Sequence, residues 1–155
     1  MLKEIIVRAI SGFLEKDSEL LRKGVCERAI AHKLAEHLQK QFNGTSPYNV
    51  DCEYNRIQGK TSLIKTLGLD PDSRKKVFPD IVVHKRGRNK NLLVLELKKK
   101  TADRNEKEFD YKKLKAYTKE LGYELGVFME FDCGNIWVEK YFKNGDECFG
   151  PMSLD

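Results

Sequence analysis

Two acidic residues and a lysine stand at the ends of neighbouring apolar segments in this chain. Asp80 comes directly before one apolar run, and Glu96 and Lys98 continue a second run, Leu92–Leu95, past the point where a buried strand would stop. Side chains two residues apart on a strand share a face, so Glu96 and Lys98 would project together. An acid that opens the adjacent strand could reach the same place. Two carboxylates and an amine have the chemistry to bind a hard divalent cation and polarise a water molecule.

The charge around these residues favours a functional site over a simple ion pair of Lys98 with Asp80 or Glu96. Between positions 60 and 104 there are 13 Lys or Arg residues against 5 Asp or Glu, whereas the rest of the chain holds 16 against 19. Basic runs alone are usually solvated surface, but this excess coincides with the carboxylates. It would attract a polyanion that carries phosphate groups.

Length and composition predict one soluble domain over residues 1–155. Hydrophobic residues make up 40% and charged residues 34%, as in ordinary globular proteins. No apolar run has the length of a membrane span and the N-terminus lacks a signal-peptide pattern, so we expect no membrane partner and a cytoplasmic location. The four cysteines form no C-x-x-C pair, which indicates reduced thiols rather than disulfides or a zinc site.

The order of segments predicts an α/β fold with a central mixed β-sheet flanked by helices. Periodic apolar positions predict helices, whereas alternation and short apolar runs predict strands. The expected order is two helices, three strands, a helix and two strands. The helices are expected at 2–15, 19–42 and 105–121, and the strands at 48–56, 80–85, 92–98, 124–131 and 136–142. Residues 57–77 are expected to form a basic loop with one short helix at 63–67, and residues after 143 a polar tail.

Glu27 stands out among the acids of the predicted helices. Helical spacing places Glu27 in the same apolar stripe as Ile30 and Leu34, where an unpaired carboxylate would be costly to bury. The alternative is a glutamate at the edge of the helix that pairs with Arg28 or Lys23. The pattern does not decide between the two.

Other polar residues are ambiguous in the same way. Asp110 shares a helix face with apolar residues, but a first-turn acid that favours the helix dipole is the simpler explanation. On the same helix, Lys113 and Tyr117 could point towards phosphate or lie on a solvated face. His84 shares a strand face with Asp80 and could assist a site there, although a surface histidine is the simpler interpretation.

The residues with candidate chemistry resemble the PD-(D/E)xK nuclease superfamily. The chain contains Pro79-Asp80, then 15 residues, then Glu96-Leu97-Lys98, with Glu27 on an earlier helix. Both short motifs are common, but their placement at the ends of adjacent strands makes them more specific. The string PDIVVHKRG…NLLVLELKK is also similar to small bacterial or phage members. The resemblance implies a restriction-endonuclease-like core of helix, three strands, helix and strand over about residues 19 to 131.

The resemblance also implies a role for each residue. Asp80 and Glu96 would hold Mg²⁺, or Mn²⁺ in its place, together with the backbone carbonyl of Leu97. Lys98 would orient the attacking water or stabilise developing charge, and Glu27 would join through a metal-bound water or a second ion. The residues that would neutralise the backbone phosphates of the nucleic acid are Arg74, Lys75, Lys76, Arg86, Arg88, Lys99 and Lys100.

These expectations favour a metal-dependent nuclease that hydrolyses phosphodiester bonds, with DNA as the expected substrate. One alternative is a catalytically silent nucleic-acid-binding or assembly module that keeps the nuclease fold. Another is a protein-interaction subunit that docks through the helix at 2–15. Cutting both strands of a duplex is easier with two active sites, so a homodimer is a further expectation.

Overall fold

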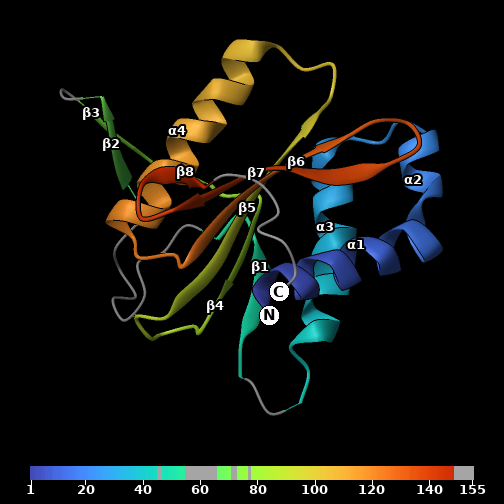
Figure 1. The fold of residues 1–155 in the computed structure, drawn as a ribbon, viewed down its shortest axis with the longest axis horizontal. Coiled ribbons are helices and arrows are strands. Elements are labelled where there is room, and N and C mark those ends of the chain that lie inside the picture. The colour runs from blue at the N-terminus through green and yellow to red at the C-terminus, as the bar shows by residue number, and fades with distance from the viewer. Residues whose placement is uncertain (45–46, 55–65, 71–72, 77, 149–155) are drawn as a thin grey trace.

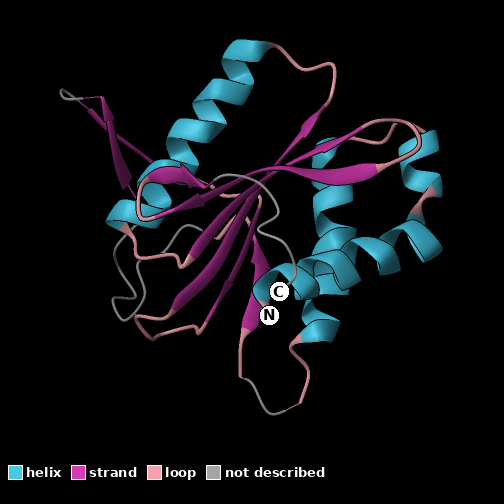
Figure 2. Cartoon of the chain, viewed as in Figure 1, coloured by secondary structure: helices cyan, strands magenta, loops and turns pink. Residues whose placement is uncertain are grey.

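The computed structural model describes residues 1–44, 47–54, 66–70, 73–76 and 78–148, and of residues 66–70 and 73–76 it describes the backbone. The helices are α1 (Leu2–Asp17), α2 (Glu19–Arg22), α3 (Glu27–Gln41) and α4 (Arg104–Glu120). The strands are β1 (Asn49–Cys52), β2 (Thr66–Asp70), β3 (Ser73–Lys76), β4 (Ile81–His84), β5 (Asn91–Lys99), β6 (Leu125–Phe131), β7 (Ile136–Lys143) and β8 (Asp146–Cys148). Figure 2 shows these helices and strands by type.

A mixed sheet forms the centre of the fold, as the sequence predicts, and it has six strands where five were expected. The strand order is β1-β4-β5-β6-β7-β8, and β2 and β3 form a separate hairpin. Neighbours pair antiparallel except β5 and β6, which run parallel because α4 connects them as a crossover. The chain is therefore α/β with a mixed sheet.

The helices cover both faces of this sheet. Figure 1 shows α1, α2 and α3 on one side and α4 on the other. Alternation along β5 explains the division, since Leu93, Leu95 and Leu97 join the core under α1 and α3, whereas Val94 joins the core under α4. Buried on both faces, β5 reads in the sequence as an almost continuous apolar run.

A close helix contact holds α1 against α3. Gly12 of α1 leaves room for the ring of His37 on α3, because a Cβ atom at Gly12 would lie 2.9 Å from Nδ1 of that ring. His37 Nε2 lies 2.6 Å from Oδ2 of Asp17, at the end of α1. This contact fixes the position of α3, whose first residue is Glu27.

The second expected helix, at 19–42, is divided in two. Gly24 adopts a positive φ of 63°, a left-handed conformation that ends a helix readily at glycine, and Cys26 is extended. The single helix was therefore a wrong prediction. Glu27 opens α3 instead of lying in a helix interior.

Two further expectations are corrected. The predicted loop contains the β2–β3 hairpin, so the short helix expected at 63–67 is wrong where it overlaps β2, and residues 63–65 lie outside the described part. The expected polar tail includes β8, which pairs with β7. None of the described helices combines the length and the hydropathy that a membrane span requires.

Candidate active site

Strand register brings Asp80 to the acidic end of β5. Ile81 pairs with Leu95 and Val82 pairs with Val94, so the same antiparallel register extended by one residue sets Asp80 opposite Glu96. Asp80 Oδ2 accepts a hydrogen bond of 2.7 Å from the backbone N–H of Leu97. Asp80, which directly precedes β4, is thus held by the Glu96-Leu97-Lys98 motif at the end of β5, as the sequence spacing predicts.

The side chains of this strand end face α4. Val94 lies in the core under α4, so the alternation of β5 directs Glu96 and Lys98 to the same side. Helix α4 contributes Asp110 and Lys113 to this place. Asp110 is 4% exposed and lies beyond the first turn of α4, so the expectation of a first-turn acid was wrong.

Lys98 lies between two carboxylates from different helices. Its Nζ is 4.0 Å from Oε2 of Glu27 and 3.8 Å from Oδ2 of Asp110. In the described residues its ion pairs are to these two groups, whereas Asp80 and Glu96 were the partners considered from the sequence. The lysine therefore links the N-terminus of α3 with the face of α4.

Lys113 is the partner of Glu96. Its Nζ lies 2.9 Å from Oε1 of Glu96 and 3.3 Å from Oδ1 of Asp110, and its side chain is 11% exposed. A solvated lysine was one of the two options left open by the sequence, and this position excludes it. Lys113 and Asp110 belong to the candidate site together with the four predicted residues.

Burial and like charge dominate the electrostatics of the site. Burial and then the neighbouring charge of Asp80 raise the pKa of Glu96 well above its usual value. Burial also raises the pKa of Asp110 and of Glu27. Burial lowers the pKa of Lys113, but Glu96 and Asp110 outweigh it and the net pKa is raised. The site thus concentrates carboxylates beyond what its two ammonium groups neutralise.

Glu27 reaches the site from the far side of the sheet. The partners considered from the sequence are engaged elsewhere, because Lys23 pairs with Glu19 at 2.9 Å and Arg28 with Glu53 at 3.1 Å. Oε2 of Glu27 is buried, faces Lys98 and has no hydrogen-bond partner among the described residues. The kink before α3 aims this carboxylate at the end of β5.

The side chains of the predicted metal ligands do not by themselves form a complete metal-binding site in the described structure. Within the described part of the chain, no three His, Cys, Asp or Glu side chains group closely enough to hold a metal ion. The carboxylates of Asp80 and Glu96 and the carbonyl of Leu97 have the oxygen chemistry that Mg²⁺ takes, and Mg²⁺ usually keeps several water ligands. The magnesium site stays a prediction.

The predicted phosphate-binding residues do not form one surface. Lys99 and Lys100 are exposed at the site end of β5. Arg86 and Arg88 lie beyond the other end of β4, and Arg86 forms an ion pair with Asp51. The side chains of Arg74, Lys75 and Lys76 are outside the description of the structure.

His84 is a buried residue and not the surface histidine that the sequence favours. It is 0% exposed, and its Nε2 lies 2.7 Å from Oδ2 of Asp51 on β1. The ring of Tyr54 contacts it edge-on at 4.4 Å between centroids. These contacts tie β1 to β4, and the sequence pattern missed them because the partners are 33 residues apart.

The chain was also compared with known proteins. No protein-family model, no curated protein and no solved structure matches it.

Proposed function

We propose that this protein is a metal-dependent nuclease with a restriction-endonuclease-like core, acting most readily on DNA. The observation that supports the proposal best is the convergence of Asp80, Glu96 and Lys98 with Glu27. Asp80 directly precedes β4, Glu96 and Lys98 belong to β5, and Glu27 begins α3. The strand register and the ion pair of Lys98 bring them to one end of the sheet. The parallel β5–α4–β6 unit beside a meander of three antiparallel strands agrees with the expected core.

The oxygen atoms of these residues are of the kind that binds a divalent cation. Asp80 and Glu96 stand opposite each other, and burial with the charge of Asp80 raises the pKa of Glu96. A cation between two such carboxylates would relieve this repulsion. Mg²⁺ would be held by these two carboxylates and the Leu97 carbonyl, and when bound it would supply Lewis-acid polarisation of a phosphodiester and of water.

The remaining residues can be assigned roles without the metal. The ammonium group of Lys98 lies beside its two ion-pair partners, Glu27 and Asp110. There it can stabilise negative charge that develops on a phosphate. Glu27 is half-buried, and burial raises its pKa, so this carboxylate takes up a proton more readily than an exposed glutamate does. Lys113 keeps Glu96 in place.

A second candidate is a nucleic-acid-binding module without catalysis. One observation favours it, since Lys113 lies 2.9 Å from Glu96 and already neutralises that predicted ligand. In a working nuclease this lysine must share or yield the carboxylate when the metal binds. A homodimer stays a prediction under either function.

Cleavage assays separate the two candidates. Plasmid and oligonucleotide substrates are incubated with the protein and Mg²⁺, Mn²⁺ or EDTA. We expect cleavage that EDTA abolishes, and Lys98→Met should lower the rate at least about 100-fold while DNA binding stays within about twofold. Lys115→Met on the exposed face of α4 removes the same charge and is the matched control.

Two results would count against the nuclease. One is cleavage at equal rates by wild type, Glu96→Gln and Lys98→Met, which indicates a contaminating enzyme. The other is salt-sensitive binding with no cleavage in either metal, which supports the binding module. Thermal unfolding of each variant shows whether a loss of activity is a loss of fold.

A further inference from the structure

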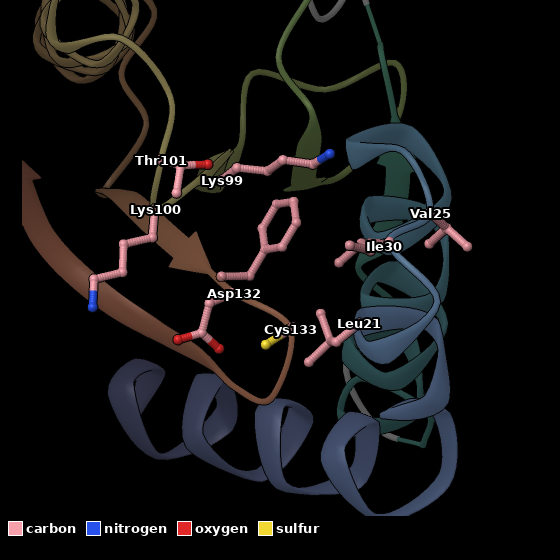
Figure 3. Close-up of a pocket in the computed structure, with 10 residues that line it drawn as sticks. Leu21, Val25, Ile30, Lys99, Lys100, Thr101, Asp132 and Cys133 are labelled. Carbon is pink, nitrogen blue, oxygen red and sulfur yellow. The ribbon is translucent and has the colours of Figure 1, made fainter.

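A pocket opens beside the candidate site, between the helices of one face and the ends of β5 and β6. Its volume is about 320 Å³. In Figure 3, Leu21 and Ile30 lie on the helical side, Cys133 lies opposite Leu21, and Lys99 extends along the rim towards α3. The roles assigned above leave this pocket without a function.

The walls of the pocket suit a flat apolar ring. Leu21, Val25, Ile30 and Phe131 contribute aliphatic and aromatic surface. The volume is at the lower end of the range for small-ligand pockets, roughly 300 to 1,000 Å³. A single heterocycle therefore fits better than a larger ligand.

The rim adds a positive charge next to this apolar space. Lys99 is exposed and directly follows Lys98 of the site. The carboxylate of Asp132 also lines the pocket, but its Oδ1 accepts hydrogen bonds of 2.9 and 2.8 Å from the backbone N–H groups of Gly134 and Asn135. Asp132 is thus committed to the turn after β6, whereas Lys99 and Lys100 both line the pocket, are exposed and carry charge available to an anionic ligand.

A neighbouring hollow leads from the pocket to Glu27 of the site. A second hollow of about 280 Å³ is lined by Glu27 and Glu106, and it shares Lys99 and Thr101 with the first. A ligand with its ring in the apolar pocket would carry an attached phosphate past Lys99 towards Glu27. An apolar ring joined to a phosphate chain describes a nucleotide within a strand.

Exposed aromatic rings nearby support the same ligand. Phe109 is 44% exposed on α4, and its ring centre lies 5.9 Å from Nζ of Lys113, the partner of Glu96. Phe78 is 55% exposed and stands two residues before Asp80. Exposed aromatic rings of this kind are surfaces on which unpaired bases stack.

We infer that the pocket of Leu21, Val25, Ile30 and Phe131 binds one unpaired base of the substrate, with the adjoining phosphate on Lys99. A base within a duplex is paired and stacked, so it can enter such a pocket only after flipping out at a cost in free energy that an unpaired base does not incur. The preferred substrate therefore carries an unpaired nucleotide next to the bond that is cut, as in a single strand, an overhang or a frayed end. This inference rests on the proposed nuclease function and specifies its substrate.

Binding in EDTA tests the pocket without cleavage. Fluorescence anisotropy is measured with a labelled single-stranded DNA, the matching RNA and a blunt DNA duplex. Cys133→Trp and Val25→Trp fill the pocket from opposite walls, and Asn89→Trp, in the exposed turn after β4, adds the same side chain far from it. We expect both pocket variants to weaken single-strand binding about tenfold, with duplex binding and the Asn89→Trp control unchanged. The two single-stranded probes show which nucleic acid is preferred.

The outcomes distinguish this inference from the function on which it rests. If both tryptophan variants fold, as judged by thermal unfolding, and bind single strands as wild type does, the pocket does not hold a base. Equal losses for single strand and duplex also overturn it. If either of these two binding results is found and the wild-type protein still cuts nucleic acid in Mg²⁺, the nuclease function stands without the base pocket. If pocket variants lose single-strand binding but wild type cuts nothing, the catalytic function fails instead.

Discussion

Glu96 is the residue on which the candidate site depends most. Its carboxylate is 2% exposed, stands opposite Asp80 and is paired with Lys113. A buried carboxylate without a partner is costly, so the protein retains it through an ammonium group or an added cation. The stability of the fold and the chemistry of the site are therefore coupled at this position.

Replacing Lys113 with methionine should expose this coupling. Lys113→Met keeps most of the side-chain volume but leaves Glu96 without its cation and Asp110 with Lys98 alone. We expect the free energy of unfolding to fall by about 3 kcal/mol, because one partner of a buried ion pair is removed. Urea unfolding at pH 7 in EDTA measures it.

A double-mutant cycle supplies the control for that change. Glu96→Gln removes the charge that Lys113 balances, so Lys113→Met should cost at least about 1 kcal/mol less in the Glu96→Gln protein than in wild type. Equal costs in the two backgrounds would show that the 2.9 Å contact contributes no coupling.

Residue-level prediction from the sequence succeeded where spacing along one element carries the signal. The alternation of Glu96 and Lys98 and the position of Asp80 before an apolar run were enough to bring these three residues together. Lys113 could not be assigned in the same way, because a lysine on a helix face has no local mark of its partner. Asp110 shares a helix face with apolar residues, which is a local sign of burial, but only the packing of α4 shows that it is buried.

Strand β1 shows how an edge element is held in this fold. It has four residues and pairs with β4 alone in the described sheet. Asp51 of β1 accepts hydrogen bonds from His84 and Arg86. The distance from Nε of Arg86 to Oδ2 of Asp51 is 2.9 Å. A strand this short gains little from its ladder, so these contacts contribute much of its attachment.

Removing the charge of Asp51 should give a pH-dependent loss of stability. Burial raises the pKa of Asp51, but the hydrogen bonds from His84 and Arg86 outweigh it and hold the pKa far below its usual value. A lowered folded-state pKa stabilises the fold above the unfolded-state pKa of about 3.9, and this stabilisation is lost as the pH falls through the folded-state pKa. Asp51→Asn should therefore cost about 2 kcal/mol at pH 7 and progressively less below about pH 4.

Urea unfolding of wild type and Asp51→Asn at several pH values measures this difference. Glu53→Gln serves as the comparison, because Glu53 is exposed and pairs with the exposed Arg28. Its cost should be within about 0.5 kcal/mol at each pH. An Asp51→Asn cost that is unchanged between neutral and acid pH would exclude the charged pairing as its cause.

At the level of elements, the sequence predicted those with strong periodicity and missed those set by single residues or by tertiary pairing. α1, α4 and the strands β4 to β7 follow from apolar patterns. The division into α2 and α3 depends on Gly24, one weak signal in a long helical pattern. In the β2–β3 hairpin, the alternation of Leu67 and Leu69 is confined to the five residues of β2, and β3 has the sequence Ser-Arg-Lys-Lys with no apolar residue to reveal a strand.

At the scale of the whole molecule, exposed basic residues lie at two opposite ends of the sheet. Lys99 and Lys100 lie beside the acids of the site, whereas Arg88 and Lys90 lie in the turn where β5 begins. The eight residue steps along β5 at about 3.3 Å each set these groups roughly 25 Å apart. The sequence merges them into one basic region because only β5 separates them along the chain, whereas this extended strand holds them far apart in space.

Salt dependence of nucleic-acid binding decides which end is the binding surface. The logarithm of the binding constant falls with the logarithm of salt concentration in proportion to the number of phosphates contacted, so each lysine on a phosphate contributes about one to the slope. We expect Lys99→Ala with Lys100→Ala to reduce the slope by about two in anisotropy titrations in EDTA between about 50 and 200 mM KCl. Arg88→Ala with Lys90→Ala removes the same net charge and should leave the slope within about 0.5 of wild type. A larger reduction from the Arg88 and Lys90 pair would move the nucleic acid to the opposite end of the sheet, away from Asp80 and Glu96, and would contradict both the site and its proposed substrate.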